Sequence, residues 1–159
     1  MYIDKNRMFS DAQVISASTD ATGTNIIDLG VGRSIGTGEP MCVVFQIDVA
    51  ADQGTGDEDY AFQVEYATSA AQTTYRVVSR VAFESGTPAA GFLDADLLVA
   101  GYVFAVPVPP VSDSVDDRFL GVRYDVAGTT AGLTVTAWLA PQSMVDSAKT
   151  IYASGYSLP

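Results

Sequence analysis

Hydrophobic and polar residues alternate along four segments of the chain. Residues 60–66 read Tyr-Ala-Phe-Gln-Val-Glu-Tyr, and the same period of two runs through residues 45–49, 120–126 and 133–139. Successive side chains of a β-strand point to opposite faces of a sheet. The pattern therefore predicts at least four strands, each with one face on a core and the other in water.

Four further segments are rich in β-branched and aromatic residues and are bounded by turn-forming residues. They are residues 13–16, 25–29, 75–83 and 101–108. The total of about eight strands is that of a jelly roll or a similar sandwich. The body of the chain lacks the helical i, i+3, i+4, i+7 spacing of apolar residues, and only residues 142–152 favour a short helix. We predict an all-β, antiparallel, jelly-roll-like sandwich.

The predicted loops are rich in glycine, proline and acidic residues, and they lie at residues 51–59, 85–91 and 109–117. The length of 159 residues fits a single domain. We expect a sandwich body at residues 14–140, because residues 1–13 and 141–159 lie outside the alternating pattern. These two end segments are predicted to be extended N- and C-terminal arms.

Composition restricts the class of protein. Hydrophobic residues make up 48% of the chain and charged residues 17%, which is typical of a folded protein. The longest uncharged apolar stretch, residues 97–111, is interrupted by glycine and three prolines, so we expect no membrane span of ~20 residues. The first eight residues lack the apolar segment of a signal peptide, and the single Cys42 agrees with synthesis in a reducing cytoplasm.

Charge argues against nucleic acid as a direct partner. Eight basic residues oppose nineteen acidic ones, which gives a net charge of -11. The basic residues are scattered along the chain, whereas binding to phosphates depends on clustered lysine and arginine.

Few residues suggest catalysis. The sequence has no histidine, which excludes Ser-His-Asp and Cys-His arrangements and histidine-ligated metals. Cys42 lies in an apolar segment without a basic neighbour, so we expect a buried, unreactive thiol. The glycine-rich run at residues 30–38 fails the nucleotide-loop templates, because Ile35 replaces the third glycine and no Gly-Lys-Ser/Thr follows.

Acidic groups at residues 57–59, 94–96 and 116–117 could form a glycosidase pair or bind calcium. They match no EF-hand spacing, and we interpret them as solvated loop charge. We therefore predict that the protein is not an enzyme and has no catalytic residues, no cofactor and no metal site.

Trp138 leaves two interpretations open. It falls on the strand face opposite Val135, Ala137 and Leu139. An outward tryptophan near tyrosines could be a platform for a sugar, which would make the protein a carbohydrate-binding module of an adhesin-like kind. Alternatively an arm or a neighbouring subunit covers the ring, since aromatic residues are enriched in interfaces and in cores.

Seven short motifs, in order, resemble those of the capsid cement (decoration) proteins of tailed bacteriophages. They are MYIDK (1–5), FSDAQ (9–13), NIIDLG (25–30), GTGEP (36–40), PVPP (107–110), RFLGVRY (118–124) and TAG (130–132). The resemblance implies a jelly-roll-like virion protein that forms small homo-oligomers, dimers or trimers. It also implies a place on the outer surface of the expanded capsid, where the protein ties neighbouring subunits of the major capsid protein together against internal DNA pressure.

If the protein has this role, the two arms are our candidates for contacts with the capsid, because apolar residues on an exposed arm need a covering partner. The candidate partner-binding residues are Tyr2, Ile3, Met8, Phe9, Ile151, Tyr152, Tyr156 and Leu158. The alternative, that each arm packs on its own sandwich, stays open.

Overall fold

The computed structural model describes residues 5–16, 20–30, 38–109 and 116–145. Its strands are β1 (Met8–Ser16), β2 (Asp20–Thr22), β3 (Ile27–Asp28), β4 (Met41–Val49), β5 (Asp59–Ala67), β6 (Tyr75–Glu84), β7 (Leu93–Asp94), β8 (Val103–Val108), β9 (Phe119–Ala127) and β10 (Gly132–Pro141). Two short 3₁₀ turns, η1 (Lys5–Arg7) and η2 (Ala95–Leu97), and a helical turn at residues 142–145 complete the described elements. None of the helices in these described ranges is long and apolar enough to cross a membrane.

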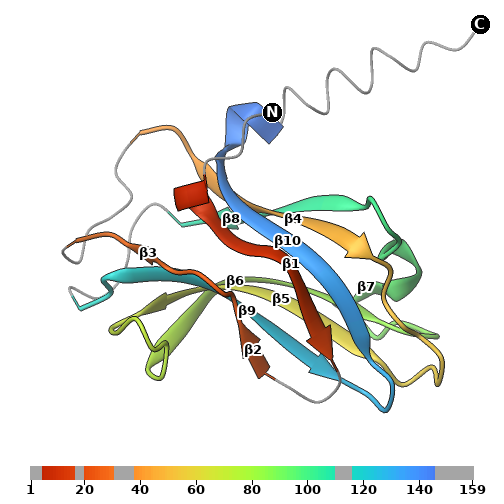
Figure 1. Ribbon diagram of the computed structural model, residues 1–159. Coiled ribbons are helices and arrows are strands. Elements are labelled where there is room, and N and C mark those ends of the chain that lie inside the picture. Colours follow the sequence, from red (N-terminus) through yellow and green to blue (C-terminus); the bar gives the residue numbers. More distant parts are fainter. Residues whose placement is uncertain (1–4, 17–19, 31–37, 110–115, 146–159) are drawn as a thin grey trace, which may run out of the picture.

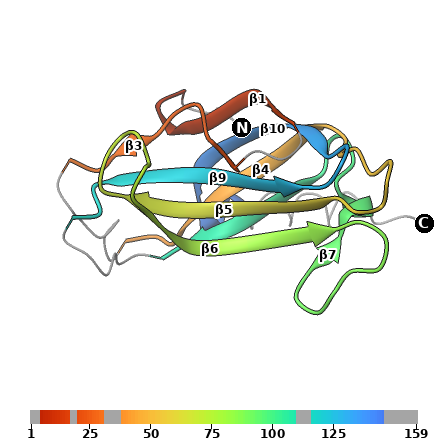
Figure 2. The same ribbon diagram turned by 90° about the horizontal axis from the view of Figure 1, so that it is seen from below.

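The strands form two sheets that pack face to face (Figure 1). Sheet A has the order β1-β10-β4-β8, and sheet B has the order β2-β9-β5-β6-β7, with β3 also paired to β9 (Figure 2). The prediction of an all-β sandwich is confirmed.

The pairing is that of a jelly roll. The antiparallel pairs are nested along the chain: β1 with β10, β2 and β3 with β9, β4 with β8, and β5 with β6. Successive pairs alternate between sheet A and sheet B, as in one long hairpin rolled into a sandwich. With β2 and β3 taken as one interrupted strand and β7 as a two-residue extension, the roll has eight strands.

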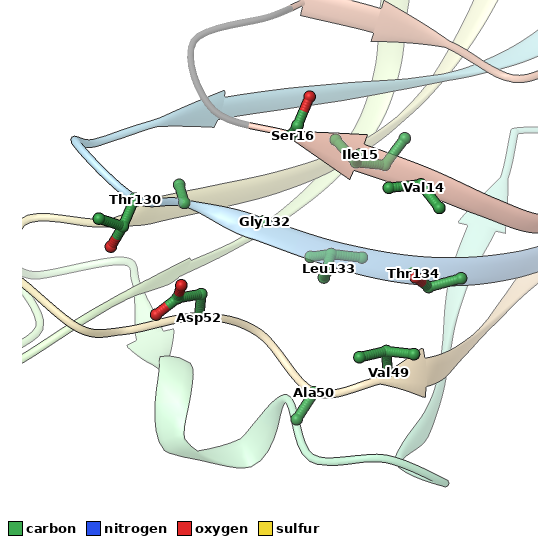
Figure 3. A pocket seen from close by; sticks show the side chains of 11 residues that line it. Val14, Ile15, Ser16, Val49, Ala50, Asp52, Thr130, Gly132, Leu133 and Thr134 are labelled. Carbon is green, nitrogen blue, oxygen red and sulfur yellow. The ribbon is translucent and has the colours of Figure 1, made fainter.

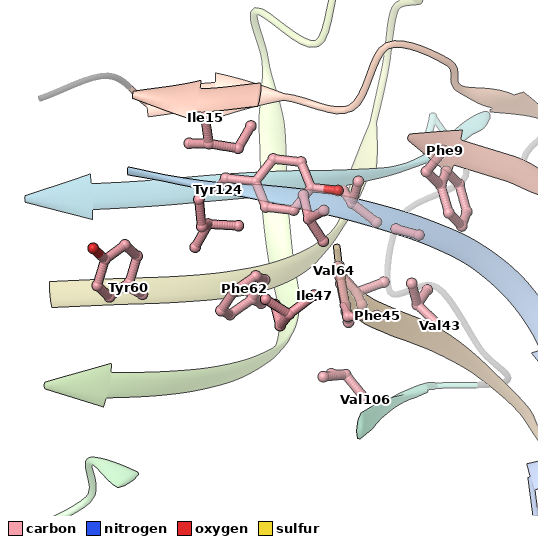
Figure 4. Packing of buried hydrophobic residues seen from close by; sticks show 14 of the residues in the cluster. Phe9, Ile15, Val43, Phe45, Ile47, Tyr60, Phe62, Val64, Val106 and Tyr124 are labelled. Atoms are coloured by element: carbon pink, nitrogen blue, oxygen red, sulfur yellow. The ribbon is translucent and has the colours of Figure 1, made fainter. Parts of the chain in front are cut away.

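Aromatic rings fill the space between the sheets (Figure 4). The ring of Phe62 lies 5.4 Å from that of Phe45, 5.8 Å from Phe83, 5.0 Å from Phe104 and 5.9 Å from Tyr124, measured between centroids. All four neighbours pack edge-on or nearly so, an arrangement that adds about 0.5–1.5 kcal/mol per pair to the burial of apolar area. The alternation in the sequence accounts for this core, because alternate side chains of a strand point to the same face of its sheet.

The prediction that residues 8–13 belong to an N-terminal arm is wrong, because these residues are part of β1. The strand is irregular: its register with β10 shifts twice between Met8 and Gln13, and Ala12 has a φ of 46°. A bulge of this kind interrupts the alternation of side chains. The sequence pattern therefore hides this part of the strand. Inside the sandwich the hydroxyls of Ser10 and Tyr124 lie 2.7 Å apart, which ties β1 to β9.

The ends of the body agree in part with the prediction. Residues 142–145 form a helical turn within the segment predicted to be helical, and the remaining residues, 146–152, lie outside the described ranges. The body reaches Pro141, one residue into the predicted C-terminal arm.

Candidate functional site

The predicted capsid-contact residues that the structure describes are Met8 and Phe9. Phe9 has no exposed surface and belongs to the core, so the prediction of an exposed contact is wrong for this residue. Met8 is half-buried against the outer face of sheet A. The other candidates lie outside the described ranges: Tyr2, Ile3, Ile151, Tyr152, Tyr156 and Leu158.

Trp138 lies on the outer face of sheet A but is only 5% exposed. It belongs to a small apolar cluster, the outer cluster, whose members are Cys42, Val44, Trp138 and Ala140, flanked by Met8, Ala105 and Val145. The protein's own residues therefore cover the ring, and the interpretation as an exposed sugar platform is wrong. The burial of the Cys42 thiol is confirmed, and Sγ donates to the carbonyl of Ala140 at 3.4 Å.

A buried ion pair crosses the outer face of sheet B. Nε of Arg123 donates to Glu65 at 2.7 Å and Nη1 donates to Asp20 at 2.8 Å. The Gln72 amide donates to the other oxygen of Glu65 at 2.7 Å, and the guanidinium stacks 3.6 Å from the ring centroid of Tyr75. These contacts hold β2 and the turn before β6 against the sheet.

Sequence reasoning missed this network, because Glu65 occupies a position that the alternation assigns to water. Its carboxylate is fully buried, and burial raises the pKa of Glu65 against the opposing effect of Arg123. The available signal was a pair of opposite charges on outward positions of two long strands, together with Gly121. Glu65 lies opposite Gly121 in the register, where the missing side chain leaves room for Gln72.

The loop carboxylates hold two loops together at one end of the sandwich. Glu58 accepts hydrogen bonds from the amides of Thr55 at 2.9 Å and Gly56 at 2.8 Å, and from the Thr130 hydroxyl at 2.8 Å. Asp57 accepts from the Thr129 hydroxyl at 3.0 Å. The prediction of solvated charge is wrong for Glu58, which has no exposed surface. Its hydrogen bonds, that from the Thr55 hydroxyl first, lower the pKa to about 2.

The remaining acidic candidates also make structural contacts. Asp94 caps η2 by accepting from the amide of Asp96. Asp117 is buried and pairs with Arg76, so the prediction of solvated charge is wrong for this residue as well. Asp59 lies opposite Glu84 on β6, and its pKa is raised by burial and by the nearby carboxylate of Glu84. Within the part of the chain that the structure describes, no group of three or more His, Cys, Asp or Glu side chains could hold a metal ion.

A shallow groove of about 450 Å³ lies where β1 and β4 end and β10 begins (Figure 3). Val14, Thr134 and Val49 are register partners across these strands and line it. Asp52 is the titratable side chain of its lining, and its carboxylate accepts from the amide of Gly54. This groove thus offers an apolar contact surface without a pair of acid and base groups.

The fold and these contacts define the class: an all-β, jelly-roll sandwich protein whose buried charges hold loops and strands together. The chain belongs to the Bbp16 family, whose model matches residues 9–139. This family is derived from phages, so the match is compatible with a phage protein. None of the curated proteins matches the chain.

Proposed function

We propose that this protein is a capsid cement protein of a bacteriophage. It binds the outer surface of the expanded head as a homo-oligomer and ties neighbouring major capsid subunits together. It is made in the host cytoplasm and ends up in the virion.

The observation that carries the proposal is the family match, which covers most of the sandwich body and points to a phage. Two further points support it. Jelly rolls are common in viral capsid proteins, which supports the proposal by analogy of fold. The ordered motifs in the sequence resemble those of cement proteins.

The physical effect follows from mass action. A protein that binds only the expanded lattice stabilises it by about 3–4 kcal/mol per site at 100–1,000 times the dissociation constant. A head has many such sites, so the sum is large. In an oligomer, the second contact is effectively intramolecular, which strengthens the hold on two subunits at once.

Co-sedimentation tests the proposal. The purified protein is mixed with expanded heads that lack it, and in parallel with unexpanded proheads. We expect saturable binding to the expanded heads, weaker binding to proheads, and heads that withstand a higher temperature before they release DNA. A protein that sediments with neither particle would contradict the proposal.

A further inference from the structure

The β8 strand lies at the edge of sheet A. One edge of β8 pairs with β4, and within the described ranges no strand pairs with its other edge. Unpaired edge groups invite the addition of another strand, and proteins normally protect them with charges, bulges or short strands.

The other long edges carry such protection. In β1 the bulge at Ala12 breaks the edge, and the Gln13 side chain and Asn25 amide bond across to neighbouring backbone. In β6 the register shifts beside Val78, and the strand carries Arg76 and Arg80. By contrast β8 reads Val-Phe-Ala-Val-Pro-Val, with no charge and no shift of register, so Pro107 near its end is its one protecting residue.

The direction of the β8 backbone groups follows from the hydrogen bonds at its start. Ile47 donates to Tyr102 and accepts from Gly101, so its backbone groups point toward the β8 side. The backbone groups of every second residue of an antiparallel strand point the same way, so those of Phe45 and Val43 also point toward β8. Their register partners are Phe104 and Val106, whose backbone groups therefore point toward β4.

The intervening residues of β8 therefore point their backbone groups outward. They offer the amides of Val103 and Ala105, and the carbonyls of Val103, Ala105 and Pro107. Pro107 fits this arrangement, because the amide that it lacks would point away from β4.

Exposed apolar residues lie on β8 and on the segment that leads into it. They are Leu93, Leu97, Val99 and Val103. An incoming strand would thus find backbone groups to pair with and apolar side chains to cover.

We propose that an extended segment of the major capsid subunit adds to β8 as a further strand of sheet A. The inference rests on the proposed function and names the contact through which it acts. Main-chain hydrogen bonds supply the affinity of such a contact, and alternate side chains supply its specificity.

Charge favours a capsid segment over a second copy of this chain. Each copy carries a net charge of -11, so pairing two β8 edges brings two strongly acidic proteins together. A segment flanked by lysine or arginine meets no such repulsion.

Proline substitutions on the outward positions test the contact. Ala105→Pro removes an amide that makes no bond to β4 and places a ring on the edge, whereas Ala105→Val keeps the amide. Val103→Pro and Val103→Thr form a second matched pair at a half-exposed site. Urea unfolding first establishes that each variant folds.

We expect the folded proline variants to bind expanded heads at least about tenfold more weakly than their partners, which corresponds to about 1.4 kcal/mol. Hydrogen exchange gives an independent measurement. In the free protein the amides of Val103 and Ala105 exchange faster than those of Phe104 and Val106, and on heads they become protected.

Three results would overturn the proposal, and they are distinguishable. If wild-type protein binds heads and the proline variants bind equally well, the edge is not the contact, although the cement role stands. If the free wild-type protein is an oligomer and the proline variants are monomers, the occupant is a second copy. If wild-type protein does not bind heads, the proposed function and this inference fail together.

Discussion

A methyl group at residue 121 would lie 2.0 Å from Nε2 of Gln72. Gly121→Ala therefore pushes the Gln72 amide away from Glu65 and leaves a buried carboxylate oxygen short of a donor. We expect a loss of about 1–3 kcal/mol in the free energy of unfolding. Urea denaturation measures it.

A double-mutant cycle isolates the cause of that loss. Gln72→Gly removes the obstructing side chain and suits the φ of 51° at this position. In that background Gly121→Ala should cost much less than in the wild type. Equal costs in the two backgrounds would mean that the clash with Gln72 is not the reason.

Glu58 is expected to make the free energy of unfolding depend on pH in the acid range. Its pKa in the folded protein is about 2, below the ordinary 4.5, so the charged form is the one that the fold stabilises. This contribution is complete above pH 4.5 and is lost as the pH falls toward 2. Glu58→Gln should lower the urea midpoint at pH 7, and the gap to the wild type should narrow over that acid range.

The exposed Asp96 supplies the control for this pH effect. Asp96→Asn removes an exposed carboxylate of η2 to which no described residue donates a hydrogen bond, so the difference between its urea midpoint and that of the wild type should be smaller than for Glu58→Gln at pH 7. A Glu58→Gln protein whose gap to the wild type stays constant from pH 7 to pH 2 would contradict the assignment.

Sequence reasoning predicts core residues better than buried charges. Phe62 and Tyr124 follow from alternation alone, because apolar side chains on one face must be buried. Glu65 and Arg123 break that rule, since each charge is buried only because the other is there. A partnership between strands 58 positions apart leaves little trace in a local pattern.

At the scale of the element, the outer face of β10 carries the chain's single tryptophan. Because the outer cluster covers Trp138, we expect blue-shifted fluorescence that iodide quenches weakly. Trp138→Ala should cost about 3–5 kcal/mol. Trp138→Phe keeps an aromatic ring in the outer cluster and should cost less than Trp138→Ala, since no described residue hydrogen-bonds to Nε1.

Emission like that of free tryptophan, with strong quenching, would show that the ring is accessible after all. It would also restore the sugar-platform interpretation. Titration with a panel of glycans then becomes the decisive measurement, because a bound sugar would alter the emission of an exposed ring.

Length and regularity decided which strands the sequence could predict. The four segments with strict alternation lie within β4, β5, β9 and β10. By contrast β2 and β7 span three and two residues, too few for a period of two to appear. The start of β1 was missed for another reason, because its bulge disrupts the pattern.

At the scale of the whole molecule, excess negative charge opposes folding. Raising NaCl from 10 to 100 mM shortens the screening length from about 30 Å to about 10 Å. We expect the free energy of unfolding to rise over this range, because screening weakens repulsion within a chain of net charge -11. Thermal unfolding at fixed pH measures the change.

Asp59→Asn supplies the matched variant. It removes the carboxylate of Asp59, which lies on β5 opposite Glu84 on β6, and keeps the shape of the side chain. This variant should be more stable than the wild type at 10 mM NaCl and should gain less from added salt. A wild-type protein that loses stability as NaCl rises would contradict the role of repulsion.

The order of motifs resembles that of a family of phage proteins, and the family match agrees at that level. Neither could indicate the exposed edge. Whether a strand is central or at an edge depends on the order of strands in the sheet, and a run such as Val103–Val108 fits both places.

The strand order also determines when the protein can fold during synthesis. In sheet A, β10 lies between β1 and β4, yet of the described strands it is the last to leave the ribosome. Until then β1 and β4 have no common neighbour, and the sheet cannot close. A nascent chain cut short before residue 132 therefore lacks the strand that joins the two halves of sheet A, and only chains that include β10 can yield a folded protein.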